Sequence, residues 1–227
     1  MTLDWGALAL TAQLATITSV ILLALATPLA WWLARSDRSW VGWIETVVAL
    51  PLVLPPTVIG FYLLVLLAPE SSVGAWWYAT TGESLLFSFE GLVLASLIYS
   101  LPFAVQPLQT AFGSVNNNLL EAATTLGASF PDRFLRIVLP LSRRGYLTAA
   151  VLTFAHTVGE FGIVLMIGGN IPGETRVASI ALYESVETLE YGSAHQMALA
   201  LLGFSFLVLL LVYVSNRVWA PKSEGGL

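Results

Sequence analysis

The sequence contains no cysteine, which excludes disulfides, thiol catalysis and thiolate metal sites. Charged residues make up only 10% of the chain, against roughly 25% in an ordinary soluble domain. Only one of the nine basic residues is a lysine, Lys222, and it follows Pro221. A P-loop needs lysine directly after glycine, so the chain has no ATP site of that kind. The net charge of −5 argues against a nucleic-acid partner.

Apolar residues are abundant instead, at 57% of the chain. A helix that crosses about 30 Å of hydrocarbon needs about 20 mostly apolar residues. Five stretches meet this requirement, at about 7–33, 46–68, 91–113, 146–168 and 197–216. The sequence therefore predicts an all-α, polytopic membrane helix bundle with five transmembrane helices. We expect residues 1–227 to form a single transmembrane domain.

The basic residues are unevenly distributed between the two sets of connecting segments. All of them except Arg176 fall in the set that includes residues 114–145 and the C-terminus. Segments rich in Arg and Lys stay in the cytoplasm. The pattern therefore predicts an external N-terminus, a cytoplasmic loop at 114–145 and a cytoplasmic C-terminus.

Prolines interrupt the second and third stretches. The second contains Pro51, Pro55 and Pro56, and the third contains Pro102 and Pro107. Each internal proline removes a helical hydrogen bond and clashes with the preceding turn. In lipid the freed carbonyl groups need partners from other helices or a water-filled path. These kinks serve either packing alone or a pathway through the bundle, and the sequence leaves both open.

The 114–145 segment is too structured for a plain connector. Asn116 to Asn118 are N-cap residues, and 119–126 favours a short helix. Gly127 suits a helix C-cap, because glycine readily adopts positive φ. Pro131 suits the start of a second short helix, which we expect Pro140 to end. The segment predicts a compact knob outside the membrane, with a solvated loop as the alternative.

This knob resembles a known family. Glu121-Ala122-Ala123, Gly127 and Ile137-Val138-Leu139-Pro140 match the EAA loop of ABC-importer permeases. The resemblance implies a type I importer architecture, a homodimer, separate cytoplasmic ATP-binding subunits and an extracytoplasmic oxyanion-binding protein. It also implies that the contact with the ATP-binding subunits involves Glu121, Ala122, Ala123, Gly127, Ile137, Leu139 and Pro140.

Three further strings look like the molybdate-permease subunit: 50–57, 159–162 and 170–175. Sulfate and tungstate permeases share parts of them. The resemblance implies ATP-driven import of molybdate, and also tungstate, across the bacterial cytoplasmic (inner) membrane by alternating access. It implies no catalytic residue and no cofactor. A permease for sulfate or another solute remains an alternative, as does a passive channel or secondary carrier.

Glu160 is an ionisable residue well inside a predicted span, where such residues are functional candidates. His156 lies four residues earlier, on the same face of a continuous helix. A metal site, a proton relay and a structural His–Glu pair beside the path are all open, and flanking Gly159 and Gly162 favour close helix packing. The candidate path or gate residues are Pro55, Pro56, Thr57, His156, Gly159, Glu160 and Gly162.

The predicted orientation is testable, because introduced cysteines would be the only ones in the chain. We expect cysteines at Ser72 and Ser129 to react with a membrane-impermeant maleimide from opposite sides of the membrane. Labelling in intact cells and in inverted vesicles measures this. If both positions react from outside, the predicted topology is wrong.

Overall fold

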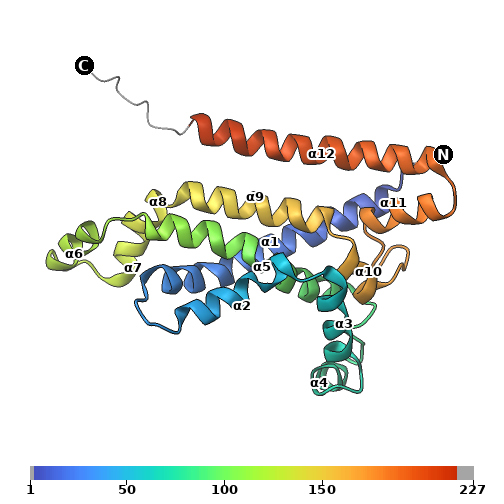
Figure 1. Cartoon of the computed structure of the whole chain (residues 1–227), viewed down its shortest axis with the longest axis horizontal. Coiled ribbons are helices and arrows are strands. Elements are labelled where there is room, and N and C mark those ends of the chain that lie inside the picture. The colour runs from blue at the N-terminus through green and yellow to red at the C-terminus, as the bar shows by residue number, and fades with distance from the viewer. Residues whose placement is uncertain (1–2, 219–227) are drawn as a thin grey trace.

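The computed structural model describes residues 3–218, and the regular elements in that range are all helices (Figure 1). A π-helical segment, η1, lies between α7 and α8. In chain order the elements are α1 (Trp5–Arg35), α2 (Val41–Val53), α3 (Pro56–Leu67), α4 (Ser72–Thr81), α5 (Phe89–Gly113), α6 (Asn117–Thr125), α7 (Phe130–Arg133), η1 (Phe134–Val138), α8 (Leu139–Leu141), α9 (Arg143–Gly159), α10 (Gly162–Gly168), α11 (Ala178–Glu187) and α12 (Tyr191–Val218).

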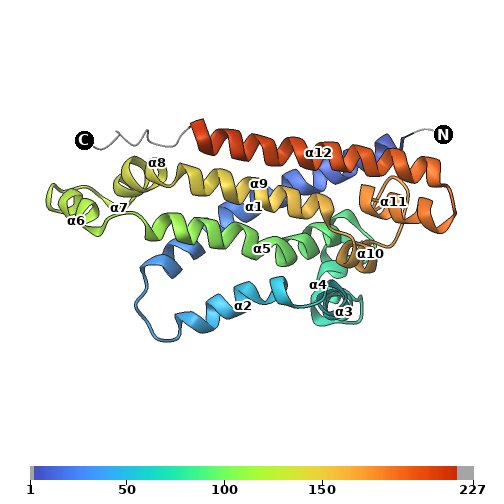
Figure 2. The ribbon, with the colours of Figure 1, turned by 45° about the horizontal axis from the view of Figure 1, so that its top comes forward.

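The long helices α1, α5, α9 and α12 run along the length of the molecule (Figures 1 and 2). Helices α1, α5 and α9 pack against one another, and α12 contacts α9 and α11. One end of the bundle carries α6, α7 and α8, and the other carries α10 and α11. Helices α3 and α4 project sideways from the bundle, away from α12. The knob and the α10–α11 region are therefore at opposite ends.

Small side chains form the contact between the three central helices. Ala26 and Ala30 of α1, Ala104 of α5 and Ala149 of α9 are all completely buried. Helices in lipid associate through close van der Waals packing, which small residues permit. Larger side chains fill the ends of this core, among them Phe112, which is also completely buried.

Three of the five predicted spans are continuous apolar helices in the described residues: α1, α5 and Tyr191–Leu211 of α12. The other two are broken. Helices α2 and α3 are bent by 110° relative to each other, and α9 and α10 by 63°. The stretches predicted as spans at 46–68 and 146–168 thus each contain a break, and each bent pair passes the length and hydropathy test for one span.

Proline chemistry explains the first break. Leu54 precedes a proline, which favours extended backbone, and its ψ is 138°. Pro55 has no N–H and its ring clashes with the preceding helical turn. Pro56 then takes the start of α3, where a proline fits.

A hydrogen bond from another helix stabilises the backbone at the second break. Glu160 follows the last residue of α9 and has an extended ψ of 135°. Its carbonyl oxygen accepts a hydrogen bond of 2.5 Å from the Ser179 hydroxyl of α11. The third predicted span, by contrast, continues through Pro102 and Pro107 as the single helix α5.

The α5–α9 crossing depends on Gly145. An added Cβ there would lie 2.3 Å from the Ala111 Cβ. We expect Gly145→Ala to destabilise the protein by about 1–3 kcal/mol through overpacking, despite a gain of about 1 kcal/mol in helix propensity. Thermal denaturation of the detergent-purified protein measures this.

Gly113→Ala is the matched control, because a Cβ on Gly113 meets no atom within 4 Å. It should leave the melting temperature unchanged or slightly raised. If Gly145→Ala has the same melting temperature as Gly113→Ala, the close crossing of α5 and α9 is contradicted.

Candidate functional site

The two helix breaks meet inside the molecule. An added Cβ on Gly162, at the start of α10, would lie 2.9 Å from the Pro56 Cβ at the start of α3. One turn further along, Gly60 faces Met166, whose sulfur would lie 2.7 Å from an added Cβ. Glycines on both helices therefore let the two broken segments pack closely. We call this contact the break junction.

Glu160 lies in the bend between α9 and α10, two residues before Gly162, and is only 5% exposed. Its Oε2 accepts a hydrogen bond of 3.4 Å from the Ser96 hydroxyl of α5. Its Oε1 is buried and has no hydrogen-bond partner among residues 3–218. A buried polar atom without a partner is costly, and such atoms often mark function. The carboxylate thus has acceptor capacity left for a group outside this chain or for another conformation.

His156 has a different set of contacts. Its Nδ1 lies 2.9 Å from the Ser100 hydroxyl, which in turn lies 3.0 Å from the Thr157 hydroxyl. The imidazole stacks on Phe103, with ring centroids 4.0 Å apart, and lies beside Tyr99 at 4.9 Å. Helix α5 therefore contacts both the polar and the apolar sides of the ring.

The expected His156–Glu160 pair is not formed. No hydrogen bond or ion pair joins the two side chains in residues 3–218, because α9 ends at Gly159 before the helical turn between them closes. Nor do the described residues contain a cluster of three or more His, Cys, Asp and Glu side chains placed to hold a metal ion.

The remaining path candidates lie on the surface. Pro55, Thr57 and Gly159 are exposed, and a Cβ on Gly159 would meet nothing within 4 Å. The prediction that glycines on both sides of Glu160 allow close packing is therefore correct for Gly162 and wrong for Gly159 within this chain. Large apolar side chains of α2 and α3 on either side of Pro55 and Thr57 in the sequence are also exposed, including Val53, Phe61 and Tyr62 at 82%, 54% and 68% exposure. We call these residues of α2 and α3 and the turn between them the exposed strip.

The knob follows the sequence prediction through its first helix. Asn116 caps α6 by accepting a hydrogen bond from the Asn118 N–H at 2.9 Å. Gly127 has a φ of +83°, the left-handed conformation that favours glycine, and this turns the chain after α6. Ser129 caps α7, and its hydroxyl donates to Asp132 Oδ2 at 2.5 Å. This bond and nearby Arg136 hold the pKa of the Asp132 carboxyl below its ordinary value.

The second half of the knob differs from the prediction. Pro140 does not end a helix, because it lies inside α8, which leads almost directly into α9. The π-helical segment η1 precedes it, and the Leu139 N–H bonds to the Phe134 carbonyl five residues earlier. The wider π turn accommodates a proline that lacks a donor and crowds the preceding turn.

The knob has a polar side and an apolar surface. Glu121 and Ala122 are exposed, whereas Ala123, Ile137 and Leu139 are half-buried. Five large apolar side chains of the knob are exposed: Leu119 at 50%, Leu126 at 87%, Phe130 at 55%, Leu135 at 59% and Leu141 at 56%. Contiguous exposed apolar groups with a polar rim mark interaction surfaces.

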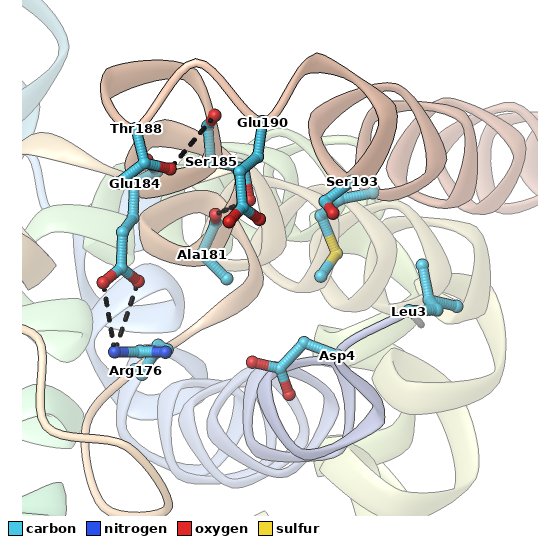
Figure 3. Close-up of a pocket in the computed structure, with 10 residues that line it drawn as sticks. Leu3, Asp4, Arg176, Ala181, Glu184, Ser185, Thr188, Glu190 and Ser193 are labelled. Carbon is cyan, nitrogen blue, oxygen red and sulfur yellow. Dashed lines mark hydrogen bonds and ion pairs between the residues drawn. The ribbon is translucent and has the colours of Figure 1, made fainter. Parts of the chain in front are cut away.

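A polar pocket of about 290 Å³ lies at the opposite end of the bundle (Figure 3). Arg176 donates to Asn170 Oδ1 at 2.7 Å and pairs with Glu184 at 3.2 Å. Thr175 closes the loop beside it by donating to the Gly168 carbonyl at 2.6 Å. The remaining lining residues shared by α11, α12 and the start of the chain include Leu3, Asp4, Ala181, Ser185, Thr188, Glu190, Ser193 and Met197.

Comparison with known proteins identifies the family to which this architecture belongs. Residues 26–220 match the family model described as binding-protein-dependent transport system inner membrane component. The chain belongs to this family. It is a multi-pass inner-membrane transport component rather than an enzyme, as the sequence predicted.

Individual relatives agree with the family. The chain is 53% identical over 97% of both chains to the molybdenum transport system permease protein ModB of Azotobacter vinelandii. It is 30% identical to a probable sulfate transport system permease protein of Nephroselmis olivacea, over 92% of this chain and 76% of that one.

The fold has a solved counterpart. A bacterial ABC transporter involved in alginate import matches with a TM-score of 0.76 and 18% identity, over 95% of this chain and 79% of that one. This likeness confirms the predicted all-α permease fold.

Sequence reasoning about this transport component missed the partners of its polar residues. Three serines of other helices bind these residues: Ser96 and Ser179 bind Glu160, and Ser100 binds His156. Serines inside apolar stretches were the available signal, because a buried hydroxyl in lipid needs a hydrogen-bond partner. Arg35 was counted only for topology, although it makes three side-chain contacts across the fold.

Substitutions of Glu160 test whether this buried carboxylate contributes to transport. Glu160→Gln can still accept from Ser96, so we expect wild-type amounts in the membrane but transport reduced several-fold, because one acceptor becomes a donor. Glu160→Leu should be worse, since it also strands the Ser96 hydroxyl at a cost of about 1–3 kcal/mol. ATP-dependent uptake into vesicles measures both.

Glu70→Gln is the control, because it neutralises an exposed carboxylate between α3 and α4. It should transport like the wild type. Normal uptake by Glu160→Leu would show that Glu160 is only a packing element.

Proposed function

We propose that the chain is the membrane subunit of an ATP-driven importer for molybdate, which also accepts tungstate. The observation that carries the proposal is the 53% identity to the ModB permease over nearly the whole of both chains. The probable sulfate permease is less similar, at 30% identity. The two dianions of molybdate and tungstate share charge, shape and nearly the same size, so one path serves both.

The ATP-binding subunits bind the knob. Energy has to arrive through a contact, because the sequence has no P-loop. The exposed apolar side chains Leu126, Phe130 and Leu135 form the surface of this contact, with Glu121 at its polar edge. The coupling residues are Glu121, Ala122, Ala123, Gly127, Ile137, Leu139 and Pro140.

A second copy of the chain covers the exposed strip on α2 and α3. Val53, Phe61 and Tyr62 present apolar area there, and Pro55 and Thr57 lie between them in the sequence. Two such strips facing each other form the two walls of a path at a homodimer interface. Helix α3 begins at Pro56, so its positive N-terminal end faces the path and favours a passing anion.

The external binding protein docks at the α10–α11 end. The polar pocket around Arg176 and Glu184 lies there, far from the knob (Figures 1 and 3). This assignment follows the distribution of basic residues, which puts the N-terminus outside and the C-terminus in the cytoplasm. The domain then spans 1–227 as one unit with 114–145 as its cytoplasmic coupling loop.

Transport proceeds by alternating access. Closure of the ATP-binding subunits displaces the two knobs, the helix breaks shift against each other, and the path opens outward to receive the anion. Spans with almost no Arg or Lys hold the dianion weakly, which favours release over retention. Candidate path or gate residues are Pro55, Pro56, Thr57, His156, Gly159, Glu160 and Gly162.

Uptake by a strain that lacks this gene tests the substrate. We expect molybdate-dependent enzyme activity to fail at trace molybdate and to return with the gene or with excess molybdate, whereas sulfate uptake stays normal. Labelled molybdate and sulfate uptake measure the two anions directly.

Loss of sulfate uptake with intact molybdate-dependent activity would contradict the proposal and favour the sulfate alternative. Uptake that continues in the reconstituted complex without ATP would favour a passive channel or secondary carrier.

A further inference from the structure

Arg35, the last residue of α1, reaches across to the start of the knob. Its Nη2 donates to two backbone carbonyl groups, those of Phe112 at 2.9 Å and Val115 at 2.8 Å. Its Nη1 donates to the side-chain oxygen of Asn117. The guanidinium carbon lies 4.9 Å from the centre of the Trp31 ring, one turn earlier in α1.

These partners lie on both sides of the α5–α6 connection. Phe112 lies in the last turn of α5, where helix carbonyl groups need outside donors, and Val115 lies in the connection that follows. Asn117 is the first residue of α6. One planar guanidinium therefore links the end of α1 to the end of α5 and the start of the knob, a geometry that a lysine ammonium cannot reproduce.

Trp31 supports the second half of the knob. Its ring packs edge-on against Phe112 at 5.5 Å, Phe130 at 6.3 Å and Phe134 at 5.8 Å between centroids. Edge-to-face aromatic pairs stabilise a contact beyond what their buried area contributes. Both halves of the knob thus contact the last turns of α1, the first half through Arg35 and the second through Trp31.

We propose that Arg35 is a positioning residue that fixes the knob to α1 and α5, so that displacement of the knob moves both helices. The proposal rests on the proposed coupling role of the knob. Without Arg35, the short connection at 114–116 can bend and absorb the displacement before it reaches the spans. ATP hydrolysis would then continue with less transport.

The experiment compares variants of the complex of this permease with its ATP-binding subunits and binding protein in proteoliposomes. The readout is labelled molybdate imported per ATP hydrolysed. We expect Arg35→Gln and Arg35→Lys to lower this ratio at least three-fold, and Asn117→Ala to lower it less. Arg35→Lys and Asn117→Ala keep the cationic charge. If Arg35→Gln does not assemble, the molybdate-to-ATP ratios of these two variants test the proposal.

Arg38→Gln is the matched control. Arg38 lies three residues further along and contacts the Trp40 ring at 5.8 Å, and no hydrogen bond of its side chain is found in residues 3–218. The Arg38→Gln variant removes the same charge from the same segment and should import as much molybdate per ATP as the wild type. Wild-type ratios in both Arg35 variants, or an equal loss in Arg38→Gln, overturn the proposal.

A second readout does not depend on transport. Spin labels on cysteines introduced at Ser39 and Thr125 report the distance between the α1–α2 connection and α6 in the same complex. We expect a narrow distribution that broadens in Arg35→Gln and not in Arg38→Gln. An equally narrow distribution in Arg35→Gln overturns the proposal. Absence of ATP-dependent uptake in the wild type would instead contradict the proposed function.

Discussion

The structure depends on one constraint, which is that every backbone polar group in hydrocarbon needs a partner within the protein. Two spans break, and each break meets this constraint locally. At the first, the Leu54 N–H bonds to Leu50 at 3.0 Å and the Val58 N–H to Pro55 at 2.9 Å, while Pro55 and Pro56 have no N–H to satisfy. At the second, the Ser179 hydroxyl of α11 donates a hydrogen bond to the Glu160 carbonyl group.

Because the two breaks contact each other, neither span can straighten alone. Gly162 lies against Pro56, and Gly60 lies against Met166 and Ile163 of α10. Closely packed interiors have few voids and switch between discrete arrangements rather than deforming smoothly. The two bends therefore form one packed unit, and the half-satisfied carboxylate of Glu160 lies in the second bend, two residues before Gly162.

Local features of this protein could be predicted from the sequence, and long-range ones could not. The turn at Gly127 and the cap at Asn116 depend on neighbouring residues, so their chemistry is visible in the sequence. The pairing of His156 with Glu160 assumed an unbroken helix and failed where α9 ends. The Arg35 contact joins residues 77 apart in the chain, and no periodicity in the sequence encodes it.

Helix α5 connects the two polar regions of the fold. Its last turn carries Phe112, which binds Arg35 and packs on Trp31, and its middle carries Ser96, which binds Glu160. At 1.5 Å per residue, the 16 residues between Ser96 and Phe112 span about 24 Å. Pro102 and Pro107 lie within this length, but the helix is unbroken there, so a tilt of its last turn can be transmitted to the serine that binds the carboxylate. The knob and the bend at Glu160 are thus linked through one helix, which binds Arg35 in its last turn and Glu160 in its middle.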